Sequence, residues 1–249
     1  TNFTNSLLVG TSGTGTLNAA ERNTGVGTGV LAALTTGDDN TAIGFNTLAA
    51  HTTGNSNAAV GRCSLTTNTT GSNNTAIGNR ALKLNLTGSG NTALGSEALC
   101  TNTEGDNNVS VGRCSLKSNT TADHNVAVGY LTLCTNTTGT NNTAVGGNAL
   151  DANTTGGYSV AIGNGSLGLH TTGSSNTAVG WNSGAATTTG ARNTFVGGGS
   201  GVGNGASNTT GDDNSFFGND AGGRNTTGAN NVAVGRDALL TNTTGNSNV

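Results

Sequence analysis

The fold of this chain is decided by one short segment, which reads NTTGTNNTAVG at residues 136–146. Segments with the same pattern recur along the sequence, and each of them ends on a glycine. These glycines recur at a constant interval from Gly10 to Gly197, and Gly218 and Gly235 continue the series after one longer repeat. The chain is therefore a tandem array, which is the signature of a protein built from stacked structural units.

The array has one irregularity, an insertion of four residues in the repeat at 198–218, where glycine is frequent. Elsewhere neither a linker nor a change in composition interrupts the repeats. We therefore predict that residues 1–249 form a single repeat array with no separate domains.

Three small residue types make up about half of the 249 residues, with 46 Thr, 43 Gly and 38 Asn. Charged residues are 8% of the chain, against about 25% in ordinary globular domains. Enzyme pockets combine charged, aromatic and histidine side chains, so we expect no enzyme, no cofactor and no metal site. A net charge of −3 gives no electrostatic reason to expect nucleic acid as a partner, and the apolar runs are too short for membrane insertion.

Counted from each repeat glycine as position 0, several repeat positions keep their chemistry. Position 4 is usually Leu, position 13 is almost always Asn, and positions 15 and 16 are usually Ala followed by Val, Ile or Leu. A repeat of this length is too short for a helix pair, and frequent glycines weaken short helices. Two short strands per repeat fit better, joined by a turn rich in Asn, Thr and Gly at positions 7 to 12. One strand runs from position 13 to the repeat glycine with its Val or Ile inward, and the other surrounds Leu at position 4.

One such coil cannot bury its apolar side chains, but stacked coils form a continuous narrow core. We therefore predict an all-β protein, a β-solenoid (a parallel β-roll or β-helix) of about 14 coils with a 17-residue repeat, flattened between two sheets. Asn and Thr repeated at one position are expected to stack as hydrogen-bonded ladders. The predicted core ladder consists of Leu48, Leu65, Leu82, Leu99, Leu116, Leu133, Leu150, Ile43, Val60, Ile77, Leu94, Val111, Val128, Val145, Ile162 and Val179.

The repeats resemble those of a known family of surface proteins. Asn-Thr-Ala-Val/Ile-Gly at 40–44, 74–78 and 176–180, and Ser-Val-Ala-Ile-Gly at 159–163, are similar to the YadA-like head repeats of trimeric autotransporter adhesins. The longer segment at 136–146 also resembles arrays in phage tail-fibre and bacterial surface proteins. The resemblance implies a left-handed parallel β-roll, often trimeric, on a cell or virion surface. The chain differs from that family in its longer coil and in lacking a coiled-coil stalk and a membrane anchor within this sequence.

Titratable residues are few and scattered. His51 and His170 occupy position 7 and His124 occupies position 12, in expected turns with no nucleophile beside them, so we assign them no catalytic role. The acidic pairs at 38–39 and 212–213 are too sparse for a calcium loop and are expected to be solvated turn residues.

The four cysteines fall into two repeat positions. Cys63 and Cys114 share position 2, and Cys100 and Cys134 share position 5. Cysteines at the same position are too far apart for a disulfide, because they are two or three coils apart. Pairing between neighbouring coils, such as Cys100 with Cys114, and small buried thiols both remain open as interpretations.

Position 7 also carries a series of Asn-x-Ser/Thr sequons in the expected turn. An exposed turn is where an N-glycan would be accepted, whereas a ladder of asparagines that stabilises the turn is the alternative. The candidates are Asn68, Asn85, Asn119, Asn136, Asn153, Asn208, Asn225 and Asn242.

Position 1 holds Phe45, Tyr130 and Trp181 among polar residues, which predicts an exposed edge where carbohydrate or another partner could be contacted. We expect a non-catalytic structural protein that forms an extracellular fibre or filament, and the head or shaft of a surface adhesin or phage tail fibre is the alternative. An ice-binding solenoid is a second alternative, suggested by Thr-Asn-Thr at 67–69, 101–103, 135–137 and 241–243.

Assembly is expected to use copies of the chain itself. Neither the first repeat nor the last carries a charged cap or a Pro that would block strand pairing, so we expect coils to continue by end-to-end stacking or in further sequence. A trimer or bundle packed through the Ala at position 15 is the other expected contact. A carboxylate placed at Leu99 or Ile77 is expected to disrupt the core.

Overall fold

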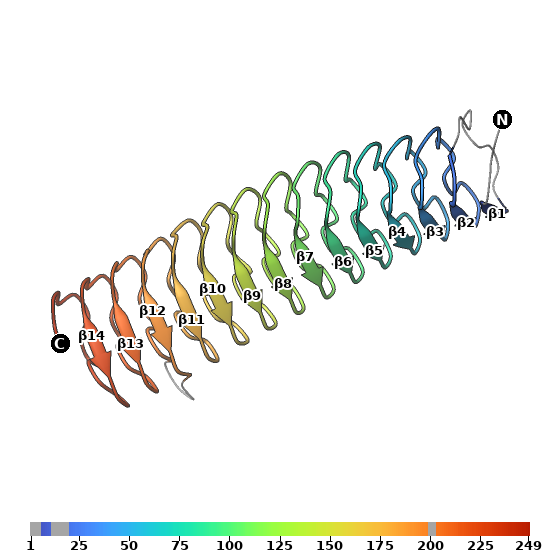
Figure 1. The fold of residues 1–249 in the computed structure, drawn as a ribbon. Coiled ribbons are helices and arrows are strands. Elements are labelled where there is room, and N and C mark those ends of the chain that lie inside the picture. Colours follow the sequence, from blue (N-terminus) through green and yellow to red (C-terminus); the bar gives the residue numbers. More distant parts are fainter. Residues whose placement is uncertain (1–5, 11–19, 199–202) are drawn as a thin grey trace. The chain divides into compact units, whose positions relative to one another are not determined.

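The structure is a computed structural model, and it describes residues 6–10, 20–198 and 203–249. It divides into two compact units, Thr1–His124 and Asn125–Val249, which are described separately. Each unit is an all-β solenoid in which every coil contributes one three-residue strand (Figure 1). In the first unit the strands are β1 (Leu7–Val9), β2 (Thr24–Val26), β3 (Thr41–Ile43), β4 (Ala58–Val60), β5 (Thr75–Ile77), β6 (Thr92–Leu94) and β7 (Val109–Val111).

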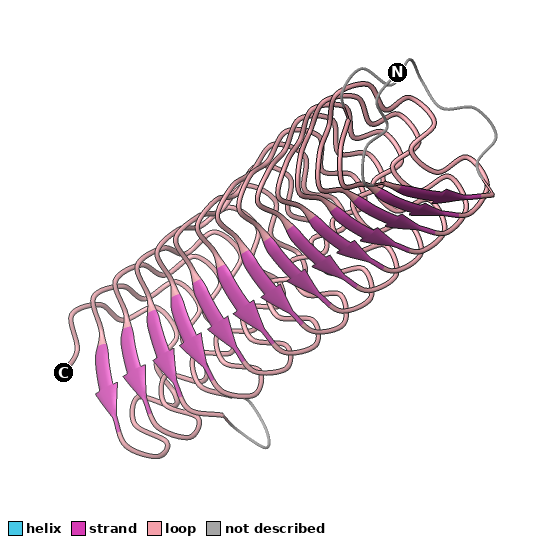
Figure 2. Cartoon of the chain, turned by 45° about the vertical axis from the view of Figure 1, so that its right-hand side comes forward, coloured by secondary structure: helices cyan, strands magenta, loops and turns pink. Residues whose placement is uncertain are grey.

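The second unit repeats this arrangement. Its strands are β8 (Val126–Val128), β9 (Thr143–Val145), β10 (Val160–Ile162), β11 (Thr177–Val179), β12 (Thr194–Val196), β13 (Ser215–Phe217) and β14 (Val232–Val234). Within each unit the strands share one side of the coils, and loops form the remaining sides (Figure 2).

Neighbouring strands within a unit pair in parallel, with an offset of one repeat. Thr75 of β5 faces Thr92 of β6, which occupies the same position in the next repeat. Between β12 and β13 the partners are Thr194 and Ser215, and the register is kept although this repeat is longer than the others. The longer repeat therefore leaves the register of the sheet unchanged, and residues 199–202 within it lie outside the described residues.

The second predicted strand of each repeat is not formed. The segment around Leu at position 4 consists of turns, and Leu48 and Leu65 have φ angles of 49° and 47°, in the left-handed region that bulky residues rarely adopt. These turns still stack, because the backbone N–H of Leu48 donates to Ser64 O at 3.1 Å in the next coil. The flattened roll between two sheets was therefore wrong, since one sheet is backed by stacked turns.

Leucines at position 4 are the most frequent large residues of the core. Those of the predicted set are fully buried, as predicted, namely Leu48, Leu65, Leu82, Leu99, Leu116, Leu133 and Leu150.

The inward assignment of position 16 was wrong. The strand residue that faces the core is the Ala at position 15, such as Ala76 and Ala93, both fully buried. Because side chains alternate along a strand, positions 14 and 16 face outward, and Ile77 is 45% exposed. The residues corrected in this way are Ile43, Ile77, Val145 and Ile162, which are exposed, and Val60, Leu94, Val111, Val128 and Val179, which are half-buried.

Asparagines form two hydrogen-bonded ladders, as predicted, and both ladders run inside the coils. At position 13, Asn57 Nδ2 donates to Asn40 Oδ1 at 3.0 Å and also to Gly71 O at 3.0 Å. At position 7, Asn85 Nδ2 donates to Asn68 Oδ1 at 2.7 Å. All four asparagines are buried, so each ladder satisfies its own amide groups while holding one coil to the next.

The core changes its composition near the insertion. Phe195 and Phe216 replace Ala at the inward strand position and pack with ring centroids 5.7 Å apart. Glycine replaces Leu at the facing turn position, and a Cβ on Gly184 or Gly222 would collide with a Phe ring. The large and small residues have exchanged places, which keeps the volume inside the coil nearly constant.

Candidate functional site

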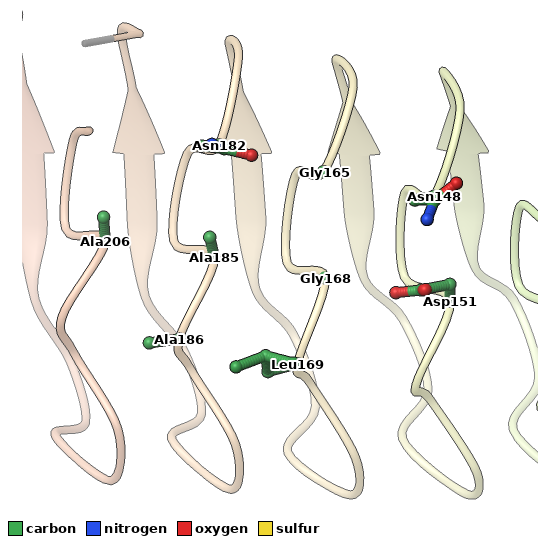
Figure 3. Close-up of a pocket in the computed structure, with 9 residues that line it drawn as sticks. All are labelled: Asn148, Asp151, Gly165, Gly168, Leu169, Asn182, Ala185, Ala186 and Ala206. Carbon is green, nitrogen blue, oxygen red and sulfur yellow. The ribbon is translucent and has the colours of Figure 1, made fainter. Parts of the chain in front are cut away.

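A groove on the surface of the second unit is large enough for a small ligand and is the candidate site. It has a volume of about 380 Å³ and is an open groove on the face formed by repeat positions 2 and 5 (Figure 3). Its lining residues are Asn148, Asp151, Gly165, Gly168, Leu169, Asn182, Ala185, Ala186 and Ala206. A volume of this size is at the lower end of the range for small-molecule sites.

The groove exists because one coil has glycine at both positions that form this face. Gly165 and Gly168 contribute no side chains, whereas the neighbouring coils carry Asn148 and Asp151 on one side and Asn182 on the other (Figure 3). Neither the carboxylate nor the two amides were singled out from the sequence. The pair of glycines is visible in the sequence, but it indicates a groove only when positions 2 and 5 are known to share a face.

Two polar side chains of the groove, Asp151 and Asn182, bring an oxygen atom toward its glycine coil (Figure 3). A Cβ on Gly168 would lie 3.7 Å from Asp151 Oδ1, and a Cβ on Gly165 would collide with Asn182 Oδ1. Partial burial raises the pKa of Asp151, although hydrogen bonds from the backbone N–H groups of Asp151 and Ala152 oppose the shift. The groove thus presents oxygen acceptors from both sides.

His51 takes the place of an asparagine in the position 7 ladder of the first unit. It is fully buried, its Nε2 lies 2.7 Å from Gly54 O, and its Nδ1 lies 3.0 Å from Asn68 Nδ2. The carbonyl requires a donor, so Nε2 carries the proton and Nδ1 accepts from the amide. Desolvation lowers the pKa of this histidine, and its role is structural.

His170 interrupts the same ladder in the second unit. Its Nε2 lies 2.7 Å from Gly173 O, but its Nδ1 has no hydrogen-bond partner in the described structure. The ladder groups on either side, Asn153 Oδ1 and Thr187 Oγ1, are also buried without a partner there. Desolvation also lowers the pKa of His170. The three groups form a local defect in the position 7 ladder.

The remaining titratable residues identified from the sequence lie on the surface. His124 is exposed. Asp39 and Asp213 are exposed turn residues that pair with arginines, Arg22 Nε lying 2.6 Å from Asp39 Oδ1 and Arg192 Nε 2.7 Å from Asp213 Oδ1. Each arginine lowers the pKa of its carboxyl partner, so these acidic pairs hold neighbouring coils together at the solvent boundary.

All four cysteines are free thiols in the structure. Cys100 and Cys114 are buried, and Cys63 and Cys134 are half-buried. Burial raises the pKa of the Cys100 thiol. The interpretation as small packed thiols is the one that fits these two buried side chains.

A charged cluster lies beside these thiols in the first unit. Glu97 accepts from Lys117 Nζ at 2.7 Å and pairs with Arg80 Nη1 at 3.2 Å, while Cys114 Sγ lies 3.9 Å from its carboxylate. Lys117 lowers the pKa of Glu97. The carboxylate is thus already neutralised by its neighbours.

The glycosylation candidates at position 7 do not lie in an exposed turn. Seven of the eight are fully buried in the ladder, namely Asn68, Asn85, Asn119, Asn136, Asn153, Asn208 and Asn225. Asn242 is half-buried, and its Nδ2 donates to Asn225 Oδ1 at 2.8 Å. The atom that would carry a glycan is therefore occupied inside the coil, and the sequon interpretation was wrong for these positions.

The position 1 aromatics are exposed, as expected, with Phe45, Tyr130 and Trp181 between 47% and 49% exposed.

The threonine hydroxyls of the Thr-Asn-Thr segment at 67–69 are not free. Thr67 Oγ1 donates to Lys83 O at 3.0 Å, and Thr69 Oγ1 donates to Leu86 O at 3.0 Å. Both hydroxyls are used to join coils.

Among the described residues, no group of three or more His, Cys, Asp or Glu side chains is arranged to hold a metal ion. Over that same part of the chain, no helix has the length and apolar character needed to cross a bilayer. Comparison with models of known protein families gives no match, and a search of curated proteins gives none either.

Proposed function

We propose that this chain is a non-catalytic structural protein, an extracellular fibre element that is extended by stacking of coils. The observation that carries the proposal is the use of inward polar side chains. At positions 7 and 13 the side-chain amides of the asparagines form hydrogen bonds to the neighbouring coil, as in the bond from Asn74 Nδ2 to Asn57 Oδ1 at 3.1 Å. These inward amides are therefore used to hold the described coils together.

The stacking contact itself supports assembly from identical copies. The contact of one coil with the next is heterologous, since the upper surface of a coil meets the lower surface of its neighbour. A heterologous contact that does not close into a ring extends into an open filament. The placement outside the cell rests on the resemblance of the repeats to those of adhesin heads and tail fibres, and adhesion by the same surface is the alternative function.

The assembly is tested with the whole chain by electron microscopy and sedimentation velocity over a range of concentrations. Filaments with the cross-section of one coil, growing with concentration, are the expected result. A species that stays monomeric at every concentration would contradict end-to-end stacking. Binding of that monomer to immobilised glycans would then favour an adhesin.

A second candidate function is favoured by the outer face of the sheet. In the first unit Thr75 of β5 pairs with Thr92 of β6, and Ile77 pairs with Leu94 beside them, which gives a two-strand patch of hydroxyl and aliphatic side chains. Ala58 and Val109 occupy the hydroxyl position on the flanking strands. Strand spacing of about 4.8 Å and a two-residue step of about 6.6 Å make this face a regular lattice, the kind of surface that an ice-binding protein needs. Thermal hysteresis that is lost on Thr92→Lys would support this function, and its absence in the parent protein would exclude it.

A further inference from the structure

The groove on the second unit carries chemistry that coil stacking does not use. Asp151 reaches over Gly168 from one neighbouring coil, and Asn182 reaches over Gly165 from the other (Figure 3). Both side chains bring an oxygen atom to the space above the glycine coil. A ligand that fits between them must offer hydrogen-bond donors.

The carboxylate in this groove has no cationic partner among the described residues. The ion pairs of the second unit join Arg192 to Asp212 and Asp213, and Arg236 to Asp237. Asp151 is half-buried, and the backbone N–H groups of Asp151 and Ala152 donate to its carboxylate. A partly desolvated carboxylate without a counter-charge is stabilised by a cation that enters the groove.

The rest of the lining is apolar and small. Leu169 and Ala186 come from position 6, and Ala185 and Ala206 extend the apolar surface away from the carboxylate. This surface fits an aliphatic body next to the charged group. A bare metal ion would leave it uncovered.

We propose that this groove is a binding site for a primary alkylammonium group, with the ammonium between Asp151 and the Asn182 amide oxygen and the alkyl chain on Leu169 and Ala185. The three N–H donors of an ammonium match the acceptors that face the glycine coil. The same chemistry is offered by a free aliphatic amine and by the side chain of a lysine.

The test uses the whole chain and three probes in nuclear magnetic resonance titrations. n-Pentylammonium is expected to bind with a Kd of about 1 mM and to shift the amide signals of Gly165, Gly168 and Ala185. 1-Pentanol, which has the same chain without the charge, is expected to bind at least about tenfold more weakly. Lysine blocked at its amino and carboxyl groups distinguishes the sources, because it matches pentylammonium only if the site takes a protein side chain.

Two variants and one control make the result specific. Asp151→Asn is expected to weaken pentylammonium binding about tenfold or more, and Asp237→Asn, on the same unit but paired with Arg236, is expected to leave it unchanged. Ala185→Leu fills the groove without changing its charge and should also remove binding. Large residues occupy the equivalent position elsewhere, as in Lys83, so this variant is expected to fold.

Three results would overturn the proposal. They are equal affinity for pentanol and pentylammonium, equal loss of affinity in the two Asp→Asn variants, and the absence of shifts at the glycine coil at millimolar amine. Circular dichroism of each variant shows whether the fold is kept. A folded Ala185→Leu variant with parental affinity would also reject the groove as the site.

Discussion

The defect around His170 predicts that a smaller side chain will stabilise the protein. In His170→Asn, the new amide can donate to Gly173 O, as His170 does now, and also to Asn153 Oδ1, which has no partner within the described residues. Satisfying one buried acceptor contributes about 1–3 kcal/mol. Losing the contacts of the ring carbons costs about 1 kcal/mol, so we expect a net gain of about 1 kcal/mol in the free energy of unfolding.

The matched control is His51→Asn. The coil before His51 has Leu34 at the equivalent position, which offers no side-chain acceptor, while the bond from Asn68 to the ring would be replaced by an equivalent one. This variant loses the ring contacts and gains nothing. Urea denaturation of both variants should therefore differ by about 1–3 kcal/mol in favour of His170→Asn.

The stability of the parent protein is expected to depend on pH through His170, in a direction that follows from the pKa of this residue. Desolvation holds the pKa of folded His170 below its ordinary value of 6.5, so the unfolded chain binds the proton more readily. Stability is then complete above pH 6.5 and is lost as the pH falls below it. The advantage of His170→Asn over the parent should be larger at pH 5 than at pH 8. If the two histidine variants have equal stability, or if the advantage does not grow at low pH, the ladder argument is refuted.

Three further predictions concern the core. Phe216→Ala should cost about 3–5 kcal/mol, and adding Gly222→Leu should restore part of this loss in a double-mutant cycle; additive losses would show that the two positions do not share one space. Leu99→Asp should abolish cooperative folding of its coil, whereas Ile77→Asp should change the stability by no more than about 1 kcal/mol because its side chain faces outward; similar effects of the two on thermal unfolding would contradict the assigned faces. Asn85→Asp removes an internal donor and buries a charge, so it should cost about 3 kcal/mol or more in urea denaturation, and a melting curve like that of the parent would place this residue outside the ladder.

The repeat length and the position of its apolar residues were enough to predict stacked coils and a leucine core. They were not enough to orient the strand, because Ala76 and Ile77 are adjacent and alternation alone does not say which of them faces inward. The structure resolves this through volume: Leu82 already fills the narrow coil, so only a small residue fits beside it. The left-handed conformation of Leu82, with φ 47°, has no sequence signal, since a bulky residue there is locally unfavourable.

The candidate site was less predictable than the fold. Asp151 is one of 12 acidic residues in the sequence, and its importance depends on the shape of the coil that follows it. Position 7 shows the same limit, since Asn85 reads as an exposed sequon or as an internal ladder residue with equal ease. Which of these applies is decided by the direction of the side chain in three dimensions.

The register that survives between β12 and β13 has a consequence for how such a gene can change. Thr194 and Ser215 still pair across the lengthened repeat, so a longer repeat does not shift the register of the sheet. Loss or duplication of one whole repeat would likewise return each coil to an equivalent neighbour. Unequal recombination between repeats at the DNA level can therefore lengthen or shorten the protein in single-coil steps without redesign of any contact.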